Sequence, residues 1–227
     1  MKHGFFKVAA ATPIIKTADP SFNAENIINM MEEAEKEGVK VLLFPELSLT
    51  GYTCNDLFFQ NTLRKSAVDS LDKIREKTKE TGAVTIVGLP LEKNAKLYNT
   101  AVFLYKGEIL GVVPKTYIPN YGEFYECRHF TPAPCENSEI SIGEKNYPFG
   151  AKMIFASKES PELKIACEIC EDLWVPAPPS IGHAMAGATL IVNPSASDEL
   201  IGKKEYRRSL VSSQSSRLLA AYMYADA

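Results

Sequence analysis

The feature of this sequence that most constrains its fold is a regular alternation of short apolar runs and longer stretches with helical periodicity. Residues 5–12 form a largely apolar run. Residues 23–37 then place Ile27, Met31 and Ala34 at spacings of four and three, which puts these side chains on one face of a helix. Repeated strand-then-helix segments are typical of an α/β domain in which helices cover a sheet.

The alternation continues along the chain. Residues 106–108 (Lys-Gly-Glu) separate two β-type runs and predict a hairpin, so this part of the sheet is antiparallel. Residues 117–147 are rich in Pro, Asn, Gly and aromatics without clear periodicity, and we predict a long functional loop there. The other predicted strands are residues 41–44, 83–89, 100–105, 109–113, 164–169 and 189–192, and the other predicted helices are residues 62–80 and 203–219.

The length of 227 residues is enough for one packed core without disulfides or metals. No internal repeat or low-complexity linker interrupts the chain, so we predict one domain over residues 1–227. The sequence ends in AAYMYADA, which has no cap, polar tail or turn signal. Such an ending lies inside or just after a strand and predicts a domain truncated at its C-terminus.

Composition argues against several classes of partner. The 25 basic and 28 acidic residues give a net charge of −3, which disfavours nucleic acid and anionic membrane surfaces. No apolar run approaches the roughly 20 residues needed to span a bilayer, so no membrane segment is expected. Five cysteines are too few, and odd in number, for a disulfide framework. A reducing, cytoplasmic location is therefore predicted.

Three reactive side chains each follow an apolar strand-like run. Glu46 follows VLLFP, Lys115 follows ILGVVP, and Cys170 follows LKIACEI. Strand ends can bring side chains from distant parts of a sequence to one rigid edge of a sheet. Together they would make a nucleophilic site, in which Glu46 accepts the thiol proton, Lys115 favours the thiolate and later the oxyanion, and Cys170 attacks.

Each of these residues also has an ordinary interpretation. Glu46 could be a helix-start or surface carboxylate, and Lys115 could be a solvated lysine at the end of a strand. Cys167 and Cys170 could form a Cys-x-x-Cys redox pair. On a continuous strand, however, residues three apart face opposite sides, and this geometry disfavours the redox interpretation.

Other kinds of site have weaker support. A serine triad is not supported, because the sequence has no Gly-x-Ser-x-Gly elbow. Phosphate-binding loops are not supported either, since neither Gly-x-Gly-x-x-Gly nor Gly-x-x-x-x-Gly-Lys-Ser/Thr occurs. A zinc site would need two ligands beyond the Cys-x-x-Cys pair. The remaining candidate ligands, which lack paired spacing, are Cys54, Cys127, Cys135, His3, His129 and His183. No metal or cofactor is therefore expected in this chain.

The sequence segments around the three reactive residues resemble motifs of a known superfamily. FPELSLTGY (residues 44–52), VPKTYIPNYGEFYE (113–126) and EICEDLW (168–174) resemble the nitrilase, or carbon–nitrogen hydrolase, superfamily, whose catalytic residues are Glu, Lys and Cys in that order. General amidases of the superfamily commonly have Tyr-Asp after the cysteine, whereas this sequence has Glu-Asp-Leu-Trp. That variant, with LTGYTCNDLF and NPSAS followed by IGKKEYRR, is similar to the glutaminase domains of the glutamine-dependent NAD⁺ synthetase family.

This resemblance implies a fold and an activity. The fold would be a four-layer α-β-β-α sandwich, and the activity would be hydrolysis of L-glutamine through a thioester on Cys170. The ammonia would pass to a following synthetase domain, which amidates deamido-NAD and uses ATP and Mg²⁺. The Ser-Gly-Gly-x-x-Ser signature of that domain is absent from this sequence. Members of the family assemble as large homo-oligomers, so a homo-oligomer is expected.

The resemblance also implies roles for individual residues. Glu46 matches the general base, Lys115 the lysine and Cys170 the nucleophile, and the backbone N–H of Glu171 would donate to the oxyanion beside Lys115. The residues that match positions lining the glutamine pocket are Tyr52, Tyr121, Glu171 and Ser197. Lys203 stands where the family often has an arginine that binds the substrate carboxylate, and it would give a point charge instead of a bidentate fork.

Glu123 falls eight residues after Lys115, where amidases of the superfamily have a second glutamate that orients lysine and substrate. Alternatively, Glu123 and Glu126 simply cap or salt-bridge the turn in which they lie. Two other functions stay open at this point. One is a free-standing amidase or carbamoylase that acts on another small amide. The other is a catalytically silent interaction domain, against which the intact Glu-Lys-Cys set argues.

Overall fold

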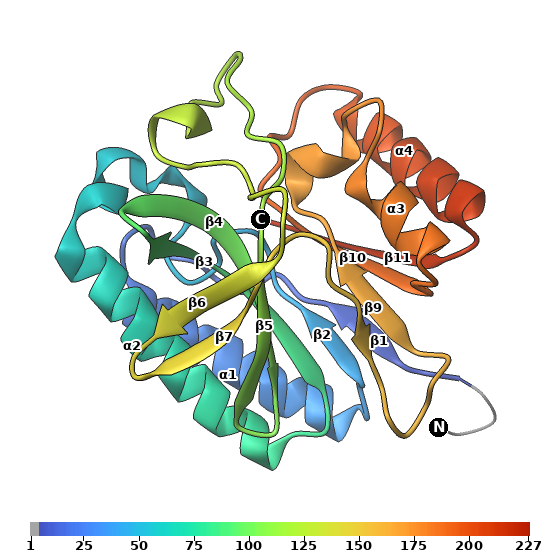
Figure 1. Cartoon of the computed structure of the whole chain (residues 1–227), viewed down its shortest axis with the longest axis horizontal. Helices are drawn as coiled ribbons and strands as arrows, with labels where there is room; N and C mark the ends of the chain where they lie inside the picture. The colour runs from blue at the N-terminus through green and yellow to red at the C-terminus, as the bar shows by residue number, and fades with distance from the viewer. Residues whose placement is uncertain (1–4) are drawn as a thin grey trace.

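The computed structural model describes residues 5–227 and confirms the predicted four-layer sandwich of the α/β class (Figure 1). Two sheets face each other at the centre. Helices α1 (Pro20–Lys36) and α2 (Asn61–Lys77) cover the outer face of the larger sheet, and α3 (Pro179–Met185) and α4 (Lys203–Leu218) cover the smaller one. None of the helices in the described part of the chain is long and apolar enough to cross a membrane.

The larger sheet has seven strands in the order β1-β2-β3-β4-β5-β7-β6. Its first three strands are parallel, as expected for strands joined by the crossover helices α1 and α2, and β3, β4 and β5 continue it as antiparallel hairpins. Its strands are β1 (Val8–Ala10), β2 (Val41–Leu43), β3 (Val84–Lys93), β4 (Lys96–Tyr105), β5 (Glu108–Pro114), β6 (Ser138–Ile142) and β7 (Lys145–Phe149).

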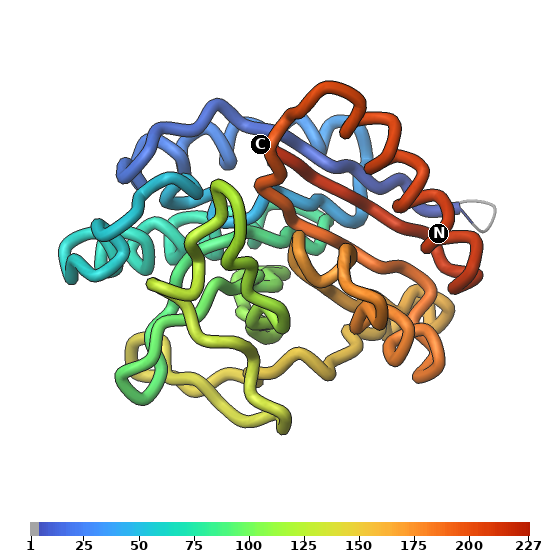
Figure 2. The backbone as a smooth tube through the Cα atoms, turned by 90° about the horizontal axis from the view of Figure 1, so that it is seen from above, coloured from blue at the N-terminus to red at the C-terminus, as the bar shows by residue number. Residues whose placement is uncertain are grey.

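The smaller sheet has four strands in the order β11-β10-β9-β8, and β9, β10 and β11 are parallel. Figure 2 shows the last strand running beside β1, and the Thr12 hydroxyl donates to the Asp226 carbonyl at 2.9 Å where the two sheets meet. The strands are β8 (Phe155–Ala156), β9 (Lys164–Cys167), β10 (Leu190–Ser195) and β11 (Ala221–Asp226).

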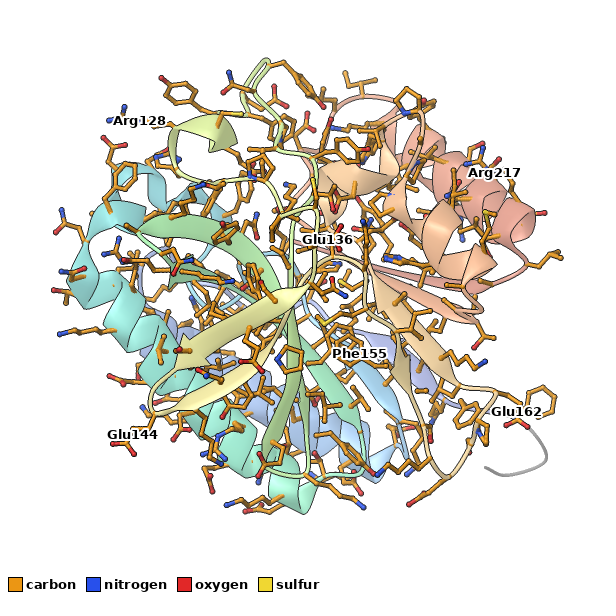
Figure 3. The ribbon with its side chains drawn as sticks, in the orientation of Figure 1. Arg128, Glu136, Glu144, Phe155, Glu162 and Arg217 are labelled. Carbon is orange, nitrogen blue, oxygen red and sulfur yellow. The ribbon has the colours of Figure 1, made fainter. Side chains whose placement is uncertain are left out.

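Apolar side chains hold the layers together. Ile27 and Met31 of the predicted helix pack with Leu71 of α2 against the outer face of the larger sheet. Between the sheets, the ring of Phe155 stacks on Phe103 with centroids 3.9 Å apart (Figure 3). Burial of these faces fixes the two sheets relative to each other, and thereby the edge where their strands end.

Two-residue turns with positive φ close the β3–β4 and β4–β5 hairpins of the larger sheet. Asn94 and Ala95 have φ of 52° and 56°, and Lys106 and Gly107 have φ of 46° and 83°. Positive φ at both central residues is typical of type I′ turns, whose twist matches that of the strands. The hairpin predicted at residues 106–108 is confirmed, while the first hairpin was not predicted because Asn-Ala lacks the usual glycine.

The predicted loop over residues 117–147 is wrong in its second half. The antiparallel pair β6 and β7 begins at Ser138, and only the segment before it is irregular. Serine, glutamate, lysine and asparagine interrupt the apolar residues of these two strands, so the apolar pattern that identifies a strand is weak.

The predicted strand over residues 164–169 ends at Cys167. Cys170 therefore lies beyond the strand, in the short 3₁₀ helix η4 (Cys170–Leu173). The argument that placed Cys167 and Cys170 on opposite faces of one strand is wrong for this reason, and both belong to the core cluster between the sheets. Both thiols are free.

Candidate active site

Glu46 lies in the turn that follows β2, at the meeting point of the two sheets. Its backbone N–H donates to the Ser195 carbonyl at the end of β10, with N and O 3.3 Å apart. The turn packs directly on Gly88 of β3, where an added Cβ would lie 2.3 Å from the backbone nitrogen of Leu47. Glycine at position 88 is thus a requirement for placing Glu46.

Lys115 follows β5, and its backbone N–H donates to the Asn99 carbonyl at 2.9 Å. Its side chain is fully buried. The Nζ atom lies 2.6 Å from Oε1 of Glu46 and 2.6 Å from Oε1 of Glu126. One ammonium is therefore held between two carboxylates.

Asn99 and Tyr52 complete this buried cluster. Asn99 of β4 donates through Nδ2 to Oε1 of Glu46 at 2.6 Å and to Oε2 of Glu126 at 3.3 Å. The Tyr52 hydroxyl donates to Oε1 of Glu126 at 2.8 Å. Tyr52 was predicted to line the glutamine pocket, but its hydroxyl binds Glu126 and it is not among the lining residues of the described pocket.

The cluster sets the charges of Glu46 and Lys115. Burial raises the pKa of Glu46 to about 7, although the Lys115 ammonium opposes this shift. Burial lowers the pKa of Lys115, but Glu46 and Glu126 more than offset this, so its pKa lies well above its usual value. Glu46 is consequently poised to exchange a proton near neutrality, while Lys115 stays an ammonium.

Cys170 begins η4 with a φ of 43°, an uncommon conformation for a residue with a Cβ. Its backbone N–H donates to Oδ1 of Asn193 at 2.9 Å. The buried Asp172 carboxylate accepts from the N–H of Ile169 at 2.9 Å and that of Tyr117 at 2.7 Å. These bonds join the turn that holds the cysteine to the segment that follows Lys115.

Burial and the Glu46 charge raise the pKa of the Cys170 thiol, and Lys115 only partly opposes them. All three side chains are thus close enough to influence one another electrostatically. This direction opposes the thiolate that was expected at Cys170 before substrate binds. Glu46 would have to remove its proton during the reaction.

A pocket of about 220 Å³ opens above Cys170. We call Glu46, Asn99, Lys115, Glu126 and Cys170 the floor of the site. We call Tyr121, Glu123, Glu171, Ser197 and Lys203, which all line the pocket, its rim. The remaining lining residues are Phe124, Trp174, Asp198 and Leu200.

The rim contains its own polar contacts. The Tyr121 hydroxyl donates to Oε2 of Glu171 at 2.8 Å, and burial together with this carboxylate raises the pKa of Tyr121 to about 12. Lys203 forms an ion pair with Asp198, and its Nζ lies 5.3 Å from the centre of the Trp174 ring. The lysine charge is therefore already shared before any ligand binds.

The role predicted for Glu123 is wrong in its position. Glu123 is exposed at the rim, whereas Glu126, three residues later, contacts Lys115. The reason is local: Tyr125 leads into the short 3₁₀ helix η3 (Glu126–Arg128), which turns Glu126 inward. Spacing along an irregular segment does not fix which of two neighbouring glutamates points to the core.

Sequence reasoning also missed Asn99, Asn193 and Gly88. An asparagine inside an apolar strand is a usable signal, because a buried amide needs partners, and both Asn99 and Asn193 stand in such strands. Gly88 interrupts a β-type run and could have indicated a close backbone approach.

No group of three or more His, Cys, Asp or Glu within residues 5–227 is arranged to hold a metal ion, and the zinc candidate His3 lies outside those residues.

Comparison with known proteins places this geometry in a family. The family model described as carbon–nitrogen hydrolase matches residues 7–225. The chain belongs to the carbon–nitrogen hydrolase family. Within it, the chain is 42% identical over 226 residues to a glutamine-dependent NAD⁺ synthetase of Mycobacterium tuberculosis, covering all of this chain and 33% of that protein. The chain thus spans about a third of the length of the relatives it matches.

Solved structures agree with this assignment to the carbon–nitrogen hydrolase family. A glutamine-dependent NAD⁺ synthetase from Cytophaga hutchinsonii is similar with a TM-score of 0.84 and 32% identity, covering 95% of this chain and 34% of that one. An amidase from Nesterenkonia sp. has a TM-score of 0.76 at 20% identity, covering 100% of this chain and 77% of that one. The second likeness shows a shared fold.

Proposed function

We propose that this chain is a glutamine amidohydrolase domain, which hydrolyses L-glutamine to glutamate and ammonia. The observation that best supports this is the buried Glu46–Lys115 pair beside the Cys170 thiol at the base of a polar pocket. The 42% identity over the whole chain to proteins named glutamine-dependent NAD⁺ synthetases supports glutamine as the amide.

In the proposed mechanism, the Glu46 carboxylate accepts the Cys170 proton while the sulfur attacks the carboxamide carbon. A C–S bond forms, and the Lys115 ammonium and the Glu171 N–H stabilise the oxyanion. The C–N bond then breaks as Glu46 returns its proton to the leaving nitrogen, which releases ammonia and leaves a thioester. Water attacks the thioester as Glu46 accepts its proton, the C–S bond breaks, Glu46 returns the proton to the Cys170 sulfur, and glutamate departs.

The charges of the rim suit an amino-acid substrate. Glutamine presents an ammonium and a carboxylate at the end opposite its amide. Glu123 and Glu171 offer carboxylates for the ammonium, and Lys203 offers a cation for the carboxylate. A simple aliphatic amide has neither charge and would make no ion pair with these groups.

The use of the ammonia is the wider part of the proposal. Because the chain spans 33% of its synthetase relatives, we infer that a synthetase domain of the same polypeptide receives the ammonia and amidates deamido-NAD. ATP and Mg²⁺ would belong to that domain. A homo-oligomeric state, a cytoplasmic location and a single domain over residues 1–227 stay predictions.

The test is incubation of the full-length protein with the electrophilic glutamine analogue 6-diazo-5-oxo-norleucine, followed by peptide mass spectrometry. We expect one adduct on Cys170 that excess glutamine suppresses. Cys167→Ala is the matched control, because it removes a buried thiol three residues away and should still form the adduct.

Two outcomes would contradict the proposal. Absence of the adduct in a folded sample would remove Cys170 as the nucleophile. Hydrolysis of several small amides without preference for glutamine would favour the free-standing amidase or carbamoylase considered above.

A further inference from the structure

The last strand places polar side chains at every second position on one face. Tyr222, Tyr224 and Asp226 alternate with Met223 and Ala225, which face the core between the sheets. The alternation is unusual, because polar groups here stand on a face that is half-buried rather than solvent-exposed. Each of them therefore needs a partner.

All three polar side chains reach residues of β10 or of the segment after it with the same diagonal offset. Asn193 donates to the Tyr222 hydroxyl at 3.0 Å, the Tyr224 hydroxyl lies 2.6 Å from Oγ of Ser195, and the Asp226 carboxylate accepts from the Ser197 N–H at 2.8 Å. Each contact joins a β11 residue to the residue two positions beyond its register partner.

The partners of β11 are themselves in contact with the site. Asn193 accepts the N–H of Cys170, and Ser197 lines the pocket. Ser195 is fully buried, and its hydroxyl donates to Sγ of Cys170 at 3.2 Å. The final strand thus supports the β10 residues that surround the cysteine.

The proton count at Ser195 fixes the direction of these bonds. A serine hydroxyl has one proton, and if it is donated to sulfur, the short contact with Tyr224 requires the tyrosine to be the donor. Burial and the neighbouring cysteine raise the pKa of Tyr224, so this hydroxyl keeps its proton at neutral pH. Tyr224 thereby orients the Ser195 proton toward Cys170.

Other charged groups near this pair are already engaged. Asp226, the acidic neighbour of Tyr224 on the same strand, forms an ion pair with Arg207 at 2.9 Å in addition to accepting from Ser197. The other charged groups that act on the Cys170 sulfur are Glu46 and Lys115, which are paired with each other. The Ser195 hydroxyl donates to the sulfur of Cys170, and Asp226, which also lies within reach of that hydroxyl, is engaged by Arg207 and by the Ser197 N–H.

We propose that Ser195 stabilises the Cys170 thiolate by a hydrogen bond to its sulfur, and that Tyr224 is the positioning residue that directs this bond. The inference rests on the proposed role of Cys170 as nucleophile. Proton removal by Glu46 creates a negative sulfur in a buried site, where a hydrogen bond to a charged acceptor is stronger than one to a neutral thiol. Ser195 would favour the deprotonated form throughout the reaction.

The test measures alkylation of Cys170 by iodoacetamide between about pH 6 and pH 10 in the full-length protein, with the adduct quantified by peptide mass spectrometry. Iodoacetamide has no amino-acid moiety, so its reaction does not depend on glutamine recognition. Ser195→Ala should lower the rate at pH 8 about tenfold and move the profile to higher pH. Tyr224→Phe should give a smaller shift of about threefold in the same direction.

Two variants serve as controls. Ser195→Thr keeps a hydroxyl donor and should restore the profile to within about twofold. Tyr98→Phe removes the hydroxyl of a buried tyrosine in the larger sheet, away from Cys170, and should leave the profile unchanged. A merely structural role for Tyr224 would lower stability without moving the pH profile.

The outcomes separate this inference from the proposed function. If Ser195→Ala and Tyr224→Phe both fold cooperatively and their profiles superimpose on that of the wild type, the inference is overturned. If wild-type Cys170 forms no adduct at any pH, both the nucleophile and this inference are overturned. If the profiles shift as expected but the wild type does not hydrolyse glutamine, only the proposed function fails.

Discussion

The floor and the rim of the site differ in burial. Glu46, Lys115 and Glu126 are 2%, 0% and 4% exposed, whereas Tyr121 is 57% exposed. Charges in the floor are removed from water, so each depends on its partner. Charges in the rim are only partly buried, with the Lys203 side chain 20% exposed, so water still screens them. The difference suggests that the floor determines the rate of the chemical step and that the rim determines the affinity for the substrate.

The largest expected effect is on the nucleophile. Cys170→Ala should lower glutamine hydrolysis by on the order of 10⁴-fold or more, because no other described thiol lines the pocket. The measurement is ammonia release by the full-length protein at saturating glutamine. Cys167→Ala should retain most of the activity. Comparable loss in both variants would support a Cys167–Cys170 pair instead of a single nucleophile.

The second prediction contrasts two glutamates three residues apart. Glu126→Gln leaves Lys115 with one carboxylate partner, so we expect kcat to fall by about 10²–10³-fold. Stability should fall by up to about 3–5 kcal/mol, as for other broken buried pairs. Glu123→Gln, at the rim, should change kcat by less than about threefold. Measurement of kcat and thermal unfolding for both variants shows which glutamate supports Lys115. An inactive Glu123→Gln beside an active Glu126→Gln would assign that role to Glu123 instead.

The third prediction concerns pH. Glu46 must be a carboxylate to accept the thiol proton, and its pKa is raised to about 7. The rate should therefore fall about tenfold for each pH unit below about 7 and reach a plateau above it. The negative charge of Glu126 contributes to raising this pKa, so Glu126→Gln should move the acidic limb to lower pH. A kcat/KM profile that is flat between pH 5 and 7 would argue against Glu46 as the base.

The sequence was sufficient to predict the fold, and it placed three reactive residues at the ends of strand-like runs. Strand ends are marked by apolar runs, and Glu46, Lys115 and Cys170 each follow one. The sandwich follows from the alternation together with the family resemblance. These features depend on local pattern, which the sequence displays directly.

The rest depends on contacts between distant segments. Asn99 and Glu126 are 27 residues apart and meet only because β4 and the turn at η3 converge on Lys115. Tyr52 faces Glu126 instead of the pocket for the same reason. The raised pKa of Cys170 was also missed, since it depends on burial and on the charge of Glu46, which a motif does not reveal.

The fourth prediction, with a smaller effect, is at the rim. Tyr121→Phe removes the hydrogen bond to Glu171 but leaves the ring in place. We expect KM for glutamine to rise about three- to tenfold with kcat nearly unchanged, because the contact lies away from the reacting bond. Steady-state kinetics separate the two parameters. A fall in kcat equal to the rise in KM would mean that the rim also contributes to the chemical step.

The smallest expected effect distinguishes a shared charge from a free one. Lys203 is paired with Asp198, so Lys203→Ala should raise KM only about threefold, because part of its charge is already neutralised. Asp198→Asn should act in the opposite direction and lower KM, since it frees the ammonium for the substrate carboxylate. Parallel measurement of KM in low and high salt tests this, because the difference between the two variants should shrink as salt screens the charges. An increase of KM in both variants would mean that the ion pair itself shapes the rim and that Lys203 does not bind the substrate.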